Sequence, residues 1–179
     1  MLAAGCGAGC ATTHYAAPSA AQLADDALPS ATTYPVFKNR KVTVRVLDNR
    51  IDRPQSVVLV DGIRGLVDRA LKRAQVGDGP EAPAVFEVRI TRYVADAELS
   101  KWKACVGFAV TVEIAPAVRH DVATERCAVT TNVWGTESAD LALREAFREG
   151  SRDLLMQVDG LPAPAPPPAP AVSPAPAVP

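Results

Sequence analysis

Apolar and polar residues alternate along four segments of the chain, which is the period of strands that are buried on one face. In the segment from Lys41 to Leu47, three valines are separated by Thr43 and Arg45. The alternation recurs in three later rows, namely Phe86, Val88 and Ile90; Val106, Phe108, Val110, Val112 and Ile114; and Cys127, Val129 and Val133. One apolar row per strand predicts a sheet that is covered on one side only.

Two further segments have the spacing of amphipathic helices. The first runs from Ser56 to Val76 despite Gly62 and Gly65, each of which costs about 1 kcal/mol relative to alanine. Its apolar positions are Val60, Ile63, Val67, Leu71 and Ala74. The second begins near Ser138, a candidate N-cap, and ends at Asp159. Its apolar stripe is Leu143, Ala146, Phe147, Gly150, Leu154 and Val158.

This order predicts an α+β domain, β-α-β-β-β-α, in which two helices pack on one face of a four-stranded, mostly antiparallel sheet. We place it at residues 37–160, which is long enough for one hydrophobic core. Residues 7–36 are rich in Ala, Ser, Thr and Pro and predict a flexible tether. Residues 161–179 are almost entirely Pro, Ala and Val and predict a disordered tail that acts as a spacer or a docking segment.

Residues 1–6 end in Ala3-Ala4-Gly5-Cys6, which resembles the lipobox of bacterial lipoproteins. There a signal peptide is cut before the cysteine, and the thiol then carries a lipid such as palmitate. Five residues before Cys6 are too few for the apolar stretch of about 7 to 15 residues that a signal needs, so we expect residues 1–6 to be a remnant and Met1 to be an internal start. Cys10 fits the motif less well. Gly7, instead of Asp, after the cysteine implies the outer membrane by the same resemblance.

Charge balance and cysteines limit the possible partners. Lys and Arg total 19 against 20 for Asp and Glu, so no net field favours nucleic acid. Cys105 and Cys127 could pair in an oxidising periplasm or remain two buried thiols. On strict alternation they would point to opposite faces unless a bulge intervenes. No zinc-binding spacing is present, and no metal or cofactor is expected.

Catalytic motifs are missing from the sequence. The two histidines are His14, in the predicted tether, and His120, in a predicted turn. No nucleophile elbow, phosphate loop or zinc-protease motif occurs, so we do not expect an enzyme.

Four residues are candidates for contact with a partner. Asp48 and Arg50 follow the first strand, and with Asp52 and Arg53 they either neutralise one another or contact a partner. Trp102 and Trp134 lie near strand ends, where they either cap the core or form part of an interface.

The Cys-terminated start, the segment Val46-Leu47-Asp48-Asn49-Arg50 and the order of elements together resemble the YajG-type family of bacterial envelope lipoproteins, over about Lys41 to Gly160. The layout is also similar to the lipoprotein partner of the lipopolysaccharide-assembly barrel and to auxiliary lipoproteins of ABC-type lipid transporters. The resemblance implies no active site, and Cys6 alone matches a position with a defined role. The Pro/Ala tail and the two core cysteines depart from the family pattern.

We therefore expect a lipid-anchored, non-catalytic lipoprotein of the outer membrane that faces the periplasm and binds an envelope protein. The alternative is a binding protein for a small ligand such as a lipid or glycan, or an auxiliary component of an envelope transport system. A sizeable apolar cavity would favour the ligand binder, whereas a filled core beside an exposed aromatic patch would favour a protein partner.

Overall fold

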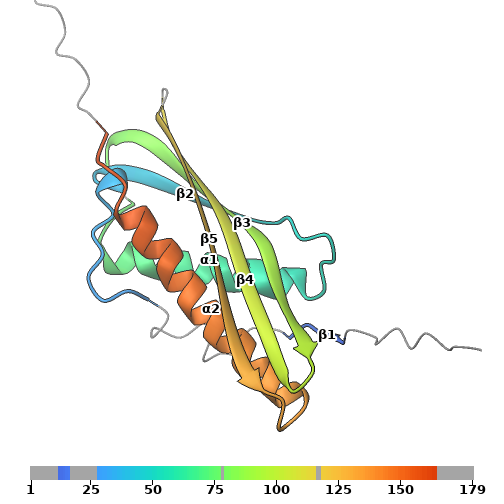
Figure 1. Ribbon diagram of the computed structural model, residues 1–179. Coiled ribbons are helices and arrows are strands. Elements are labelled where there is room, and N and C mark those ends of the chain that lie inside the picture. The colour runs from blue at the N-terminus through green and yellow to red at the C-terminus, as the bar shows by residue number, and fades with distance from the viewer. Residues whose placement is uncertain (1–11, 17–27, 78, 116–117, 165–179) are drawn as a thin grey trace, which may run out of the picture.

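The computed structural model describes residues 12–16, 28–77, 79–115 and 118–164 of the chain (Figure 1). Its elements in chain order are β1 (Thr13–His14), the 3-10 helix η2 (Pro35–Phe37), β2 (Arg40–Asp48), α1 (Ser56–Arg73), β3 (Glu81–Glu98), β4 (Lys101–Ile114), β5 (Val118–Thr131) and α2 (Thr136–Asp159). The predicted lipid-attachment residue Cys6 and most of the predicted tail, residues 165–179, lie outside the described residues.

The sheet is organised around β3, a strand of 18 residues. Along one edge β3 pairs antiparallel with β4, which in turn pairs antiparallel with β5. Along its other edge, β3 pairs in parallel with β2 over its first half and antiparallel with β1 near its end. Helix α1 joins β2 to β3, because two parallel neighbours need a crossover connection. The predicted α+β class and mostly antiparallel sheet are confirmed, and β1 is an addition.

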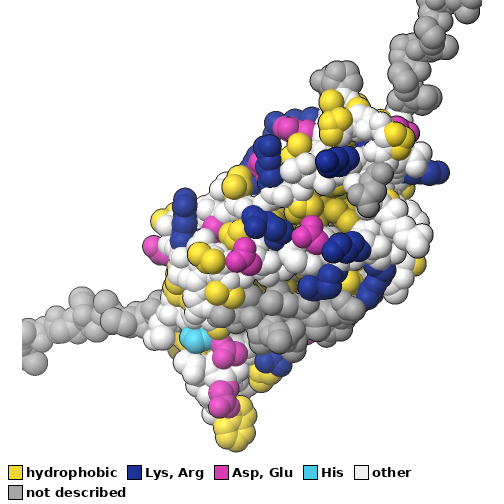
Figure 2. Space-filling model, turned by 180° about the vertical axis from the view of Figure 1, so that it is seen from behind, with side chains coloured by type: hydrophobic (Ala, Val, Ile, Leu, Met, Phe, Trp, Pro, Cys, Tyr) yellow, Lys and Arg dark blue, Asp and Glu magenta, His cyan; other side chains and the backbone are white. Residues whose placement is uncertain are grey.

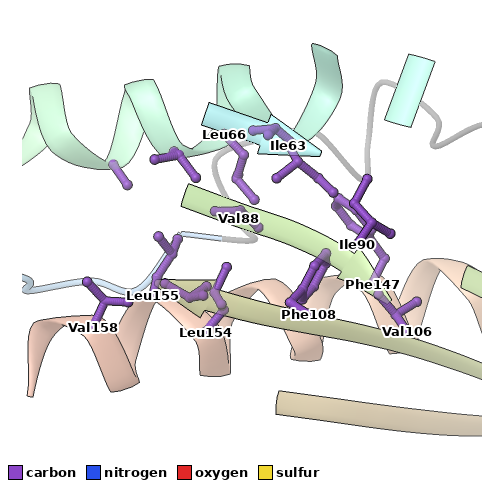
Figure 3. Close-up of a cluster of buried hydrophobic side chains, with 14 of the residues drawn as sticks. Ile63, Leu66, Val88, Ile90, Val106, Phe108, Phe147, Leu154, Leu155 and Val158 are labelled. Carbon is purple, nitrogen blue, oxygen red and sulfur yellow. The ribbon is translucent and has the colours of Figure 1, made fainter. Parts of the chain in front are cut away.

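Both helices cover the same face of the sheet, because their buried side chains meet the same alternate row of each strand. In Figure 3, Ile63 and Leu66 of α1 point toward β3, where Leu66 lies beside Val88. Phe147 of α2 packs edge-on against Phe108 of β4, with ring centroids 6.4 Å apart. The apolar positions predicted for α2, from Leu143 to Val158, are all buried.

The strand β3 contains a β-bulge that reverses its alternation. Its register with β4 shifts between Ile90 and Arg92, so the buried row continues at Tyr93 instead of at an even-numbered residue. Gly107 pairs with Arg92 at the bulge, and a Cβ there would come within 2.7 Å of Thr91 Oγ1. Glycine at position 107 therefore allows the two strands to approach at the bulge.

Described parts of the predicted tether belong to the folded domain. Leu28, Tyr34 and Val36 are buried in the hydrophobic core, and the backbone N–H groups of Thr33 and Tyr34 donate to one carboxylate oxygen of Asp159 at 2.7 and 2.6 Å. The tether prediction is therefore wrong for residues 12–16 and 28–36. It failed because a composition averaged over thirty residues conceals a few large apolar side chains at decisive positions.

Two local predictions also need correction. Helix α2 begins at Thr136, so Ser138 lies inside its first turn, where the hydroxyl accepts a hydrogen bond from the Trp134 N–H at 3.1 Å. His120 lies within β5 and not in a turn. Among the described helices, none combines the length and the apolar character that crossing a bilayer requires.

Candidate interaction surface

The face of the sheet opposite the helices carries a disulfide between Cys105 of β4 and Cys127 of β5. The two residues are direct cross-strand partners, with Cα atoms 4.1 Å apart. Direct partners in an antiparallel pair point to the same face, so the expectation of opposite faces is wrong. The expectation failed because Cys127 and Val129 of β5 were assigned to the row that faces the helices. In the structure both are exposed on the open face.

Charged side chains on this open face neutralise one another. Arg92 of β3 pairs with Glu125 of β5 at 3.0 Å, and Arg89 pairs with Glu87 along β3. Hydrogen bonds from Arg119 and from the hydroxyl of Thr111 lower the pKa of the Asp121 carboxyl. Arg119 also pairs with Glu113 at 3.4 Å. The open face is therefore polar, with alternating charges and little net charge.

Asp48 and Arg50 form a buried ion pair that organises the loop after β2. Their side chains are 4% and 5% exposed, and the guanidinium donates to both carboxylate oxygens at 2.9 and 2.7 Å. Arg50 also donates to the carbonyl of Pro54 at 2.9 Å, which closes the loop. Burial alone would raise the pKa of Asp48, but hydrogen bonds from Arg50 and Ser56 outweigh it and hold this pKa at about 2. Neither charge is accessible to a partner. The prediction that Asp48 and Arg50 contact a partner is therefore wrong, and the pair has a structural role.

The two tryptophans have opposite environments. Trp102 lies in phase with the buried row of β4, is 4% exposed and contacts the ring of His14 edge-on at 6.1 Å. It caps the core and is not a surface contact. Trp134 lies between β5 and α2 and is 70% exposed. Of the four candidate contacts, Trp134 alone has a side chain that a partner can reach.

Trp134 is joined by two more exposed apolar residues, Leu99 and Val133, and the prediction that Val133 belongs to the buried row of a strand is therefore wrong. Leu99, in the turn between β3 and β4, is fully exposed, and Val133 is 63% exposed. The two segments adjoin, because the Asn132 N–H donates to the Ser100 carbonyl at 2.8 Å. We call Leu99, Val133 and Trp134 the apolar tip. Apolar residues at the lower tip of the molecule are visible in Figure 2.

Several carboxyls among the described residues have a pKa that neighbouring groups shift. Each carboxyl whose pKa is shifted is held low by a neighbouring donor, as Asp153 is by Thr124 and then by Arg126. Cys105, Cys127 and Glu125 offer ligand atoms within 4.8 Å of one another. However, the two sulfur atoms are joined to each other, so the disulfide form presents no thiolate to a metal ion.

Four hollows on the described surface are open to solvent. They have volumes of about 190 to 390 Å³. The one of about 320 Å³ lies between β5 and α2 and is lined mainly by charged side chains, among them Arg126 and Arg152. A site that holds a small apolar ligand usually encloses most of its surface. The core, by contrast, consists of buried apolar side chains from both helices and the sheet, some of which are drawn in Figure 3.

Neither a protein-family model nor a curated protein sequence matches the chain. Among solved structures, it is similar to a minor lipoprotein from Acinetobacter baumannii, with a TM-score of 0.47 and 11% identity over 73% of this chain and 99% of the other. It is also similar to a Xanthomonas campestris protein of the DUF330 family, with a TM-score of 0.47 and 13% identity over 73% of this chain and 92% of the other. Likenesses this weak say nothing about function, and the YajG-type resemblance stays a prediction.

Proposed function

We propose that this protein is an accessory lipoprotein of the bacterial outer membrane, anchored through a lipid on Cys6 and facing the periplasm. Its folded domain binds another envelope protein and carries out no catalysis. Support for the anchor comes from the sequence Ala3-Ala4-Gly5-Cys6. Membership of the YajG-type family belongs to the same proposal.

The observation that carries the binding role is the uncovered face of the sheet. The strands β3, β4 and β5 are 18, 14 and 14 residues long, and no described element covers the side away from the helices. Small side chains, Ala109 and Ala123, lie opposite each other on this face between rows of paired charges. A polar surface with charges of both signs suits a protein partner that carries the complementary pattern.

The small-ligand alternative has less support. An apolar ligand such as a lipid would need an enclosed apolar site, whereas the described hollows are open and the core is filled. Saturable binding of a lipid or glycan to the purified domain, with no protein adduct from native envelopes, would replace the proposed function by the alternative.

The anchor is tested by labelling cells with an alkyne analogue of palmitate and comparing Cys6→Ser with Cys10→Ser, both expressed as the full chain. We expect Cys6→Ser to lose the label and Cys10→Ser, the matched control, to keep it. Retention of the label in Cys6→Ser would refute the anchor at this residue.

The partner surface is tested by a photo-crosslinking amino acid placed at Ala123, on the open face, in the native envelope. The control carries the same amino acid at Arg152, an exposed position in α2. A discrete protein adduct from Ala123, identified by mass spectrometry and missing from the Arg152 variant, is the expected result. Equal adducts from both positions, or none from either, would contradict a partner on the sheet face.

A further inference from the structure

The apolar tip is exposed without being disordered. The backbone of Trp134 is held at its N–H by the Ser138 hydroxyl, and its carbonyl accepts from the Glu137 N–H at 3.3 Å. The pairing of Asn132 with Ser100 fixes the neighbouring turn. Three large apolar side chains grouped in water on a hydrogen-bonded backbone gain little for the fold, and such exposed groups often mark a contact outside the domain.

Leu99 strengthens this argument through its backbone. It occupies the first of two residues in the turn between β3 and β4, with a φ of +48°. This position favours glycine, asparagine or aspartate, because a branched apolar residue is strained there and cannot hydrogen-bond to its own backbone. Leucine at position 99 is thus unfavourable for the turn and fully exposed as well.

The N-terminal segment enters the fold at this same end of the molecule. The Thr12 carbonyl accepts from the Ala97 N–H at 3.0 Å, only two residues before Leu99. The next residue, Thr13, pairs with Asp96 in the sheet and hydrogen-bonds its side chain at 2.9 Å. His14 contacts Asp140 of α2 at 2.8 Å. These contacts fix the point at which Thr12, the first residue after Cys6 that the structure describes, joins the domain.

The length of chain between that point and the anchor is short. Thr12 lies six positions after Cys6, so the chain between the two Cα atoms spans about 20 Å at most even when fully extended. A lipid on Cys10 would leave a shorter connection still. With the proposed lipid on Cys6, the bilayer lies near the end of the domain that carries the apolar tip.

Resting on the proposed lipid anchor, we propose that the apolar tip contacts the surface of the bilayer that holds the Cys6 lipid, with the indole of Trp134 in the interfacial region. Tryptophan is enriched at this depth, and leucine and valine gain from leaving water there. The charges beside the turn, Glu98 and Lys101, pair with each other at 3.6 Å, so contact does not depend on anionic lipid.

This contact sets the orientation of the domain. Helix α2 begins beside the tip and runs for 24 residues, about 36 Å, toward the opposite end of the molecule (Figure 1). With the tip on the bilayer, the strands rise from the membrane and the open face of the sheet is turned to the side. A membrane-bound partner can then reach this face.

The test couples the full chain carrying Cys10→Ser through Cys6 to a maleimide lipid. Because Cys105 and Cys127 are joined, Cys6 is then the remaining thiol. The vesicles contain phosphatidylethanolamine and phosphatidylglycerol, with or without bromine on the acyl chains close to the headgroup. We expect brominated lipid to quench tryptophan emission. In the matched variant Trp134→Phe, the buried Trp102 should show no quenching.

A second variant, Leu99→Asp with Val133→Asp, changes only exposed side chains and should fold. It should lose most of the quenching of Trp134. Equal emission in brominated and unbrominated vesicles would overturn the membrane contact, as would quenching that is unchanged in the double variant. Palmitate labelling of Cys6 in cells is a separate readout, so the failure of the contact and the failure of the anchor are distinguishable.

Discussion

Asp48 is a residue whose charge contributes to the stability of the described domain. Its carboxylate is buried, and the Arg50 guanidinium that neutralises it is buried as well. Replacement by Asn would leave that guanidinium without a counter-charge, which costs about 3 kcal/mol. We therefore expect Asp48→Asn to lower the free energy of unfolding by this amount in urea titrations at neutral pH. Asp52→Asn, which changes an exposed carboxylate in the same loop, is the control and should be close to neutral.

The same ion pair predicts a pH dependence. The pKa of Asp48 is about 2 in the folded protein, against about 3.9 in an unfolded chain. Its stabilising effect is therefore complete above about pH 4 and is lost as the pH falls toward 2. Urea titrations between these values should show a steeper loss of stability in the parent than in Asp48→Asn. Parallel curves for the two proteins would contradict the assignment.

At Leu99 we expect a substitution to raise the free energy of unfolding. A non-glycine residue with a φ of +48° is strained, and the side chain makes no compensating contact because it is fully exposed. We expect Leu99→Gly to raise the free energy of unfolding by about 0.5 kcal/mol, since glycine relieves the strain but adds entropy to the unfolded chain. Thermal unfolding measures this change. A clear loss of stability would show that the leucine packs within the domain.

The strands β4 and β5 are joined by a disulfide, which we expect to stabilise the fold. The disulfide joins residues separated by 22 positions, for which the loss of chain entropy in the unfolded state predicts about 3 kcal/mol of stabilisation. Urea titrations with and without dithiothreitol should differ by this amount. The variant Cys105→Ala with Cys127→Ala should match the reduced protein and should not respond to the reductant. An unchanged midpoint after verified reduction would contradict the prediction.

The sequence predicted most helices and strands, because their alternation and helical spacing depend on neighbours that are close along the chain. It was less successful for β5, an edge strand. The row of β5 that faces the helices includes polar residues such as Thr124 and Arg126, which contact Asp153 of α2. Cys127 and Val129, which are exposed, were therefore assigned to the buried row, and the two core cysteines were expected on opposite faces.

The candidate surface was predictable only in part. Trp102 could have been assigned to the core, since it is in phase with Val106 and Phe108 along β4. The environment of Trp134 depends on the folded connection after β5, and the role of Leu99 depends on a turn without the usual turn residues. The β1 pairing joins segments more than eighty residues apart, which no local pattern can reveal.

At the scale of the whole molecule, residues 28–37, which precede β2, are part of the hydrophobic core. Leu28, Tyr34, Val36 and Phe37 are buried, and Asp159 at the end of α2 holds the backbone of this segment. The sequence placed the start of the domain at residue 37, after three of these four residues. The linker before the fold therefore ends earlier than composition suggested.

Truncation tests this boundary. A chain that begins at residue 38 loses four buried side chains, and each large one contributes about 2 to 5 kcal/mol. The sum approaches the total stability of a typical domain, so we expect this chain to be unfolded or aggregated by circular dichroism. A chain that begins at Thr12 keeps both β1 and the buried segment and should unfold at nearly the same urea concentration as the full protein. A stable domain that begins at residue 38 would show that the buried segment is dispensable.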